Sequence, residues 1–446
     1  MKIRVTPPLV LDGAFDVPGD KSISHRAALF AALAEGRTEI NGFLEGEDCL
    51  ATLKAVRQLG ALVAKKAPGH YVIDGAGLTG LVEPDNIIDC GNSGTTARLL
   101  LGVLAGQPFS AVLTGDDSLR RRPMGRVAEP LRMMGAMVVG RDAGKRLPLC
   151  VSGTRPLTAL SYHSPVASAQ VKTALLLAGL WADGPVTVEE PAATRDHTER
   201  MLSGFGARLD IDGRRVRITP GVALHGQPVA VPGDISSAAF FLVAASIVRH
   251  ARVTIRNVGM NPTRTGLLEV LEAMGAELRR APNAGGQRDG VPEPAADIAV
   301  QNSTLNGIDV GGELIPRLID EIPVLAVAAC VAAGVTRIRD AAELRVKETD
   351  RIRAIAIELG RMGADIVEQP DGLEIRGGRR LRAATVSSGG DHRMAMALIT
   401  AALAADGPTL VEDTECIATS FPGFADTLNA LADTGPAGGP CVKELQ

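Results

Sequence analysis

Aromatic residues are scarce in this chain of 446 residues, which holds one tryptophan, two tyrosines and nine phenylalanines. That scarcity argues against a protein that stacks the bases of single-stranded nucleic acid on aromatic side chains. An excess of basic residues is also missing, because the formal net charge is −4. We therefore expect no nucleic-acid partner.

Long apolar runs, metal-ligand motifs and paired cysteines are missing as well. No apolar stretch reaches the roughly 20 residues that cross a bilayer, so we expect no membrane partner. The six cysteines are scattered without a CxxC pair, and the seven histidines form no HExxH motif. This pattern predicts reduced, structural cysteines and no bound metal. The N-terminal sequence shows no signal or transit pattern, which favours a cytoplasmic location.

What the chain does have is one pattern in six copies. Small polar residues open each copy, an apolar stretch follows, and a β-prone segment ends it. A helix that is apolar on every face is buried, so short alternating strands around it predict α/β units with helices inside. A glycine follows five of the stretches and predicts a left-handed residue there. The apolar stretches are 27–34, 99–105, 174–182, 238–248, 324–333 and 394–405, and the glycines are Gly36, Gly106, Gly184, Gly334 and Gly407.

A second repeated feature is a Gly-Ala pair at the end of a second helix in each unit. It recurs at Gly60, Gly135, Gly206, Gly275 and Gly363, at intervals of 75, 71, 69 and 88 residues. The longest interval holds a Pro/Gly-rich stretch, 281–296, which we interpret as a surface insertion, and the sixth copy is degenerate near Ala432. Such periodicity indicates duplicated supersecondary units. Their length favours closed packing, and the chain is too long for a single core.

The starts of the apolar helices carry cations where a helix dipole disfavours them. Arg26, Arg98, Lys172 and Arg393 lie within the first turns of four of the six copies. A helix N-terminus carries partial positive charge, so a cation there makes sense when an anion lies between the two. For any one helix, ordinary capping with a solvated cation explains the pattern. The recurrence predicts a polyanion site.

Four polar motifs stand out. Residues 18–26 place two cations and two hydroxyls near a helix start, and residues 91–96 form a Gly-rich turn after an apolar strand. Residues 116–124 hold three consecutive arginines, and residues 345–351 place Lys347 and Arg351 four apart, on one face of a helix. Glu348, between them, is a candidate acid or base. Each motif alone also fits an ordinary turn or a solvated charge run.

Taken in order, the motifs resemble those of the 5-enolpyruvylshikimate-3-phosphate (EPSP) synthase family over essentially the whole chain. The resemblance implies an α/β fold of two similar domains, each of three βαβαββ units with buried helices, an inside-out α/β barrel known as the enolpyruvyl transferase fold. The matching segments are Lys21-Ser22-x-Ser24-His25-Arg26, Gly91-Asn92-Ser93-Gly94-Thr95, Arg122-Pro123-Met124-Gly125, Arg345-Val346-Lys347-Glu348-Thr349-Asp350-Arg351, Asp391-His392-Arg393-Met394-Ala395-Met396 and Ser420-Phe421-Pro422.

The resemblance also implies where the domains meet along the chain. The first domain would comprise 1–20 and 234–446, and the second 21–233. Hinge crossings are expected near 19–21 and 232–234, and both carry the sequence Val-Pro-Gly-Asp. That repetition is expected if the two halves arose by duplication.

The implied activity is that of a 3-phosphoshikimate 1-carboxyvinyltransferase. It moves the enolpyruvyl group of phosphoenolpyruvate to the 5-hydroxyl of shikimate 3-phosphate and releases phosphate, a step toward chorismate and the aromatic amino acids. Each substrate carries a carboxylate and a phosphate, so helix N-termini and cations would offset their repulsion. The reaction requires no metal, redox cofactor or covalent nucleophile, and we expect a monomer.

Site residues are carried over motif by motif. The resemblance implies a catalytic role for Lys21, Asp320 and Glu348. Asp320 would take the 5-hydroxyl proton, although it could instead only cap the helix that starts at Ile322. The residues implied around shikimate 3-phosphate are Lys21, Ser22, Arg26, Ser168, Ala169, Gln170, Arg195, Asp320 and Lys347. Those implied around phosphoenolpyruvate are Lys21, Gly94, Arg122, Gln170, Arg351 and Arg393.

Departures from the better-known branch of the family suggest a second branch, which includes glyphosate-tolerant members. Thr419 stands where that branch has a lysine, and Ala169 where it has a serine. His197 lies near the position of a shikimate-facing tyrosine, and Glu343 where it has an asparagine. Two rival functions remain: an enolpyruvyl transferase acting on a UDP-sugar, and a non-catalytic anion-binding scaffold.

Overall fold

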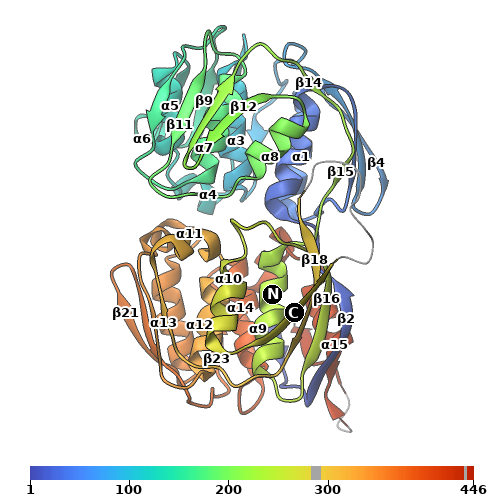
Figure 1. Cartoon of the computed structure of the whole chain (residues 1–446), viewed down its shortest axis with the longest axis vertical. Helices are drawn as coiled ribbons and strands as arrows, with labels where there is room; N and C mark the ends of the chain where they lie inside the picture. Colours follow the sequence, from blue (N-terminus) through green and yellow to red (C-terminus); the bar gives the residue numbers. More distant parts are fainter. Residues whose placement is uncertain (283–292, 436–438, 446) are drawn as a thin grey trace. The chain divides into compact units, whose positions relative to one another are not determined.

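The computed structural model describes residues 1–282, 293–435 and 439–445 (Figure 1). Contacts divide the chain into two units. Unit 1 comprises Met1–Pro18, Pro232–Gly286 and Pro294–Gln446, and unit 2 comprises Gly19–Val231 and Gln287–Glu293. The stretch 281–296 was interpreted as a surface insertion, and most of it, 283–292, lies outside the described residues. Over the described part of the chain, no helix is both long and apolar enough to cross a membrane.

Each unit is built around three buried helices, which confirms the prediction from the apolar stretches. In unit 2 they are α1 (Lys21–Leu33), α3 (Gly94–Ala105) and α7 (Ala169–Gly179). In unit 1 they are α9 (Ile235–Ile247), α12 (Ile322–Val331) and α14 (His392–Ala402). Within each unit these helices contact one another, and they form the centre of that unit's own hydrophobic core.

Two of these helices begin earlier than the sequence suggested. The side chain of Asp20 accepts a hydrogen bond from the Ile23 amide, so α1 starts at Lys21, ahead of the apolar stretch 27–34. Asp234 caps α9 in the same way by accepting from the Ser236 amide. Both aspartates end a Val-Pro-Gly-Asp segment. A side-chain cap satisfies amides that would otherwise lack partners, which explains these starting points.

A second set of helices lies outside the buried ones: α2 (Glu47–Gln58), α5 (Gly125–Met133), α8 (His197–Gly204), α10 (Gly266–Met274), α13 (Arg351–Arg361) and α15 (Phe424–Leu431). The five repeated glycines after the first five of them adopt positive φ, between 86° and 100°. The chain reverses there, and only glycine adopts this conformation without strain.

The predicted left-handed glycines after the buried helices are confirmed at two of the five positions, Gly36 (φ 84°) and Gly334 (φ 91°), and wrong at Gly106, Gly184 and Gly407. Ala34, the cap of α1, has φ −84°, and Gly106, the cap of α3, has φ −91°. That cap of α1 is already the first residue of β3 (Ala34–Asn41), so the chain continues in an extended conformation without reversing. Gly36 does have positive φ, but it lies inside that strand.

Six sheets surround the helices, and all six repeat one ladder: a parallel pair followed by two antiparallel pairs. In unit 2 the orders are β14 (Leu224–His225), β3, β5 (His70–Ala76), β4 (Leu62–Ala67), with β15 (Val229–Ala230) also on β3; β6 (Ile88–Asp89), β7 (Ser110–Thr114), β9 (Arg146–Ser152), β8 (Met137–Gly140); and β10 (Ser161–His163), β11 (Val186–Glu189), β13 (Arg215–Thr219), β12 (Arg208–Asp212).

In unit 1 the orders are β23 (Thr385–Ser387), β24 (Thr409–Glu412), β1 (Lys2–Val5), β26 (Val442–Leu445); β17 (Glu277–Pro282), β18 (Ala295–Gln301), β16 (Arg252–Gly259), β2 (Val10–Asp16), β25 (Ala432–Asp433); and β19 (Asp309–Val310), β20 (Val335–Ile338), β22 (Gly372–Arg376), β21 (Asp365–Gln369). The fold class is therefore confirmed as repeated α/β units with buried helices, and the described strands form separate sheets.

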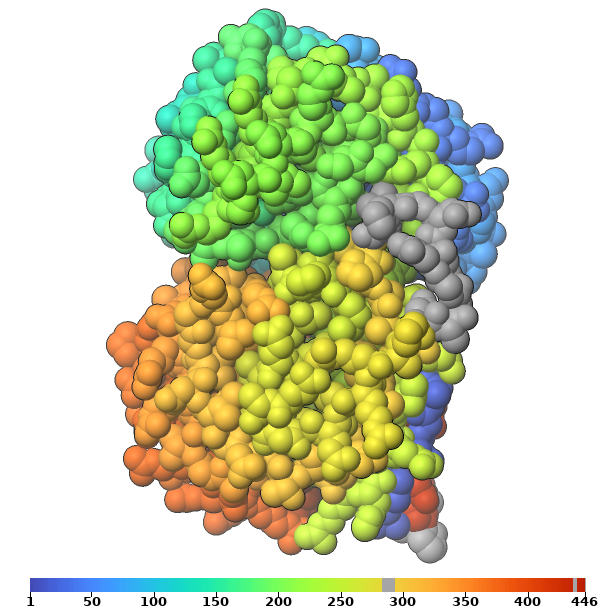
Figure 2. Space-filling view, viewed as in Figure 1, coloured from blue at the N-terminus to red at the C-terminus, as the bar shows by residue number. Residues whose placement is uncertain are grey.

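The sixth repeat is degenerate in sequence because the chain ends complete it. Strand β1 lies between β24 and β26, so Lys2 pairs with Glu412 on one side and with Leu445 on the other. Strand β2, in turn, pairs with β25. Figure 2 shows the N-terminal segment, in blue, beside the C-terminal one, in red, at the surface of unit 1. Two strands from the N-terminus thus join sheets whose other strands lie in the second half of the chain.

Candidate active site

In unit 2, polar contacts connect the N-terminal ends of the three buried helices. Arg98 of α3 donates to Oε1 of Gln170 at 2.8 Å, and Gln170 Nε2 donates to Thr95 Oγ1 at 3.0 Å. Arg26 of α1 donates to Thr173 Oγ1 of α7 at 2.9 Å. Three sets of helix amides and dipoles therefore gather in one region, as an anion site requires.

Lys21 is the first residue of α1, and its ammonium group forms an ion pair with the carboxylate of Asp48 on α2. The Lys21 side chain is 15% exposed and that of Asp48 is 8% exposed. The partner Asp48, which sequence reasoning missed, fixes the direction of the lysine. An anionic ligand can approach the ammonium group from the exposed side.

Arg26 is buried and hydrogen-bonded to neutral groups. Its Nε donates to Thr198 Oγ1 at 2.7 Å and its Nη1 to the carbonyl of Ser22 at 2.9 Å. Burial lowers the pKa of Arg26 to about 10; the nearby Glu199 partly opposes this, and the like charge of Arg195 adds to it. Arg26 therefore stays cationic near neutral pH. Two guanidinium groups that repel each other favour a bound anion.

Arg122 and Gly94 come together at the start of α3. Arg122 ends the short helix α4 (Asp117–Arg121), and its guanidinium donates to the carbonyl of Asn92 at 3.1 Å and to Asn92 Oδ1 at 2.5 Å. Gly94 opens α3 behind the Ser93 cap. A methyl group at Gly94 would lie 2.7 Å from Arg98 Nη1 and 3.4 Å from Arg122 Nη1. Glycine therefore leaves room for both guanidinium groups.

The starts of α7 and α8 carry the remaining predicted groups of unit 2. Ser168 caps the helix by accepting from the Val171 amide at 3.5 Å, and Ala169 is its first residue. Arg195 lies just before α8 and is half-buried. His197 is buried and its Nδ1 lies 2.7 Å from Oε1 of Glu293.

Lys172 does not fit the predicted polyanion site. Its ammonium group lies 2.8 Å from Glu190 Oε2 and 2.7 Å from Glu199 Oε1, and all three side chains are at most 3% exposed. Burial alone lowers the pKa of Lys172, but Glu199 and Glu190 reverse that shift and raise it above the ordinary value. Since two carboxylates already offset this charge, its role is structural.

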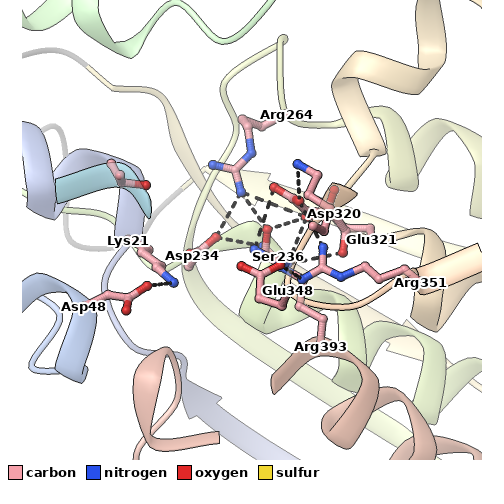
Figure 3. A network of polar contacts seen from close by, with 12 residues as sticks. Lys21, Asp48, Asp234, Ser236, Arg264, Asp320, Glu321, Glu348, Arg351 and Arg393 are labelled. Atoms are coloured by element: carbon pink, nitrogen blue, oxygen red, sulfur yellow. Dashed lines mark hydrogen bonds and ion pairs between the residues drawn. The ribbon is translucent and has the colours of Figure 1, made fainter. Parts of the chain in front are cut away.

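In unit 1, one arginine holds the predicted carboxylates together (Figure 3). The Arg351 guanidinium contacts Asp391 at 2.7 Å, Glu348 at 2.7 Å and Asp320 at 3.4 Å, and its side chain is 1% exposed. Burial alone lowers the pKa of Arg351, but Asp391, Glu348 and Asp320 raise it overall. Asp391 also accepts from the Arg393 amide at 2.9 Å as the cap of α14.

Asp320 has looser contacts with two further cations. Its carboxylate lies 3.5 Å from Lys347 Nζ and 3.9 Å from Arg393 Nη2. The side chain is 13% exposed. These distances allow both cations to exchange partners when an anion binds. The cap of α12 is Glu321, and no side chain makes the capping hydrogen bond there.

The predicted single helix through Lys347 and Arg351 is wrong. Residues Ala342–Val346 form a 3₁₀ helix, Lys347 is extended, and α13 begins at Arg351 behind the Asp350 cap. Asp350 accepts from the Arg353 amide and so starts a new helix at that point. The two cations nevertheless reach the same carboxylate oxygen, Asp320 Oδ1.

Comparisons with known proteins agree with this arrangement. A family model described as EPSP synthase (3-phosphoshikimate 1-carboxyvinyltransferase) matches residues 5–428. The chain is similar to a 3-phosphoshikimate 1-carboxyvinyltransferase of Desulforamulus reducens, with 52% identity over 97% of this chain and 99% of the relative. It is also similar to one of Geobacter sulfurreducens, with 54% identity over 96% and 98%. A solved EPSP synthase structure from Acinetobacter baumannii superposes with a TM-score of 0.86 at 43% identity and covers 99% of both chains.

Proposed function

Because the chain belongs to the EPSP synthase family, we propose that it transfers the enolpyruvyl group of phosphoenolpyruvate to the 5-hydroxyl of shikimate 3-phosphate and releases phosphate. It thereby acts in the shikimate pathway. The family match and two full-length relatives above 50% identity support the reaction. The side chains described above support a particular division of its steps.

The observation that carries the proposal is the Arg351 cluster. One buried guanidinium contacts both candidate proton-transfer groups, Asp320 and Glu348, so neither carboxylate can reorient independently. A general acid or base must be held within reach of the proton that it transfers. Asp391 fixes Arg351 from the other side by two hydrogen bonds, at 2.7 and 3.1 Å. The cluster thus positions two carboxylates for proton transfer.

We assign the proton transfers as follows. Glu348 in its protonated form gives a proton to C3 of phosphoenolpyruvate, which leaves positive charge on C2. The 5-hydroxyl oxygen of shikimate 3-phosphate forms a bond to C2 while Asp320 takes the hydroxyl proton. The bond between C2 and the phosphate oxygen then breaks, phosphate leaves, and Glu348 removes a proton from C3 to restore the double bond. Arg351 contacts both carboxylates, so it stabilises the charge of Glu348 after that residue has given up its proton and the charge of Asp320 before it takes one.

Binding roles follow from charge and placement. We assign Ser22, Arg26, Ser168, Gln170, Arg195 and Lys347 to shikimate 3-phosphate, with the backbone at Ala169. Gly94, Arg122, Arg351 and Arg393 are assigned to phosphoenolpyruvate, while Lys21 and Gln170 serve both substrates. Of these cations Arg351 is the most buried and the most completely paired. We therefore assign it mainly to positioning, with only its Nη1 side turned to the substrate.

The finer classification is also a proposal. We place the chain in the second branch of the family, because Thr419 replaces the expected lysine and its hydroxyl donates to the Cys416 carbonyl at 2.8 Å. We further propose a cytoplasmic monomer whose units move about the segments 19–21 and 232–234 when substrates bind. Scattering in solution that shows no compaction with both ligands present would contradict this movement.

The deciding experiment measures phosphate release with each substrate alone and with both together. Release is expected only with both, and it should be unchanged by EDTA. Calorimetry with shikimate 3-phosphate and with UDP-N-acetylglucosamine tests the rival transferase, and only the former should bind. If phosphate release requires a UDP-sugar, or does not occur with either acceptor, the proposed function is wrong.

A further inference from the structure

A buried charge network lies behind the Asp320 cluster in unit 1, and the proposed reaction assigns it no role. Glu321 follows Asp320 directly but turns the other way: its side chain is 1% exposed, against 13% for Asp320. Its Oε1 accepts a hydrogen bond from the Ser236 hydroxyl of α9. Glu321 therefore lies where the N-termini of α9 and α12 meet, as Figure 3 shows.

Two arginines flank this carboxylate. Arg264 Nη2 lies 4.0 Å from Glu321 Oε1, and Arg393 Nη1 lies 3.7 Å from the same atom. Arg264 is 3% exposed and also donates to Asp234 at 3.1 Å and to Ser236 at 2.7 Å. Arg393 is 10% exposed and donates to the Asp320 carbonyl at 3.3 Å. One arginine is thus fixed within the core, and the other extends toward the site.

The charge of Glu321 has an electrostatic role that hydrogen bonding does not explain. Its Oε2 is buried and has no hydrogen-bond partner among the described residues. A buried carboxylate with an unpartnered oxygen is costly, and a neutral side chain of the same shape would avoid that cost. Both arginine contacts lie at ion-pair distance rather than at hydrogen-bond distance. The negative charge therefore acts on the two guanidinium groups.

We propose that Glu321 and Arg264 form a buried positioning pair that orients the guanidinium of Arg393 toward phosphoenolpyruvate. Glu321 and the Asp320 carbonyl hold Nη1 of Arg393 from behind. Arg264 fixes Glu321 through Ser236 and through its own charge. The pair contacts no substrate and acts only through Arg393. This inference rests on the proposed function, because it assigns Arg393 to phosphoenolpyruvate.

The test uses Glu321→Gln, which keeps the shape and the contact with Ser236 but removes the charge. The KM for phosphoenolpyruvate should rise about tenfold, while kcat and the affinity for shikimate 3-phosphate change less than about threefold. Arg264→Met should show the same selective rise. Arg264→Lys should have a KM for phosphoenolpyruvate close to that of the wild type, because it keeps the positive charge. The matched control is Glu358→Gln on α13, a buried glutamate that contacts Arg361 and the Ser387 amide. It should leave the KM unchanged.

The result that overturns the inference is a wild-type KM for phosphoenolpyruvate in Glu321→Gln. A uniform decline of kcat and of both affinities, together with a lower Tm, would also overturn it, because the pair would then be only structural. If Arg264→Met does not fold, Glu321→Gln and Arg264→Lys still decide the question. Failure of the wild-type enzyme to release phosphate would instead contradict the proposed function, so the two failures are distinguishable.

Discussion

Replacing Asp320 by asparagine tests whether this carboxylate is catalytic or only structural. The change keeps the size of the side chain and removes its ability to accept a proton. Loss of a general base should lower kcat by about 10²-fold or more, which corresponds to about 2.7 kcal/mol in activation free energy. Shikimate 3-phosphate should still bind. The change removes the charge of a carboxylate 3.5 Å from Lys347, which competes with the ligand for that cation, and leaves Lys347 itself in place.

The structure predicts a small cost in stability for the same change. Asp320 makes three ion pairs at 3.4–3.9 Å, and the partly exposed ones are each worth about 0.2–1 kcal/mol. Arg351 keeps its two closer contacts, with Asp391 and Glu348. We therefore expect the free energy of unfolding to fall by about 1 kcal/mol, since pairs that share one carboxylate are not additive.

Steady-state phosphate release, calorimetry with shikimate 3-phosphate and thermal melts should be measured on the same sample. The matched control is Asp365→Asn on strand β21, which loses an ion pair with Arg379 and should keep its turnover. A turnover of Asp320→Asn within about threefold of the wild type, together with a lower Tm, would refute the reasoning. Asp320 would then be a structural residue, and the base would have to be sought elsewhere.

Three further predictions concern other ionisable side chains. Burial, with the charges of Lys21 and Arg26, holds the pKa of His25 well below its usual range. In the unfolded chain the same imidazole has a pKa of about 6.5. The free energy of unfolding should therefore fall by about 1.4 kcal/mol for each pH unit below that value. In urea unfolding, His25→Asn should not show this pH dependence. Lys172→Met leaves Glu190 and Glu199 buried without their cation and should cost about 3–5 kcal/mol in urea unfolding, of which a second change, Glu199→Gln, should restore part. Lys347→Met should weaken calorimetric binding of shikimate 3-phosphate about tenfold or more without lowering Tm, because its side chain is 25% exposed and only loosely paired; unchanged affinity would remove Lys347 from the phosphate site.

The periodicity of the sequence was enough to predict the six buried helices, because an apolar face on all sides leaves a helix nowhere but the core. The cations near the helix starts could also be found from the sequence, because they recur at the same place in the repeat. Their partners could not, because Arg351 and Asp391 lie 40 positions apart and Arg26 and Thr173 lie 147 apart. No local pattern distinguishes a cation that awaits an anion from one that a distant carboxylate already offsets. Lys172 shows the consequence.

The left-handed glycines after the buried helices were predicted only in part, and for a different reason. A glycine after a helix predicts a reversal of the chain, which holds at Gly60 after α2. After α1 the chain does not reverse but enters β3, so Gly36 lies within a strand. The sequence signal is the same in both places. What differs is the direction of the next element, which packing of the sheet decides.

The position of β1 between β24 and β26 has a consequence for biosynthesis. Residues 19–231 of unit 2 are contiguous and can fold as soon as they leave the ribosome. Unit 1 cannot, because Lys2 must wait for Glu412 and Leu445 before its sheet is complete. Closing a loop of that length is slow relative to local folding. During translation β1 therefore remains an unpaired sheet edge, exposed to wrong partners until β24 and β26 have been synthesised. A circular permutant that begins near residue 232 and joins residue 446 to residue 1 would bring these strands together in sequence and shorten that exposure.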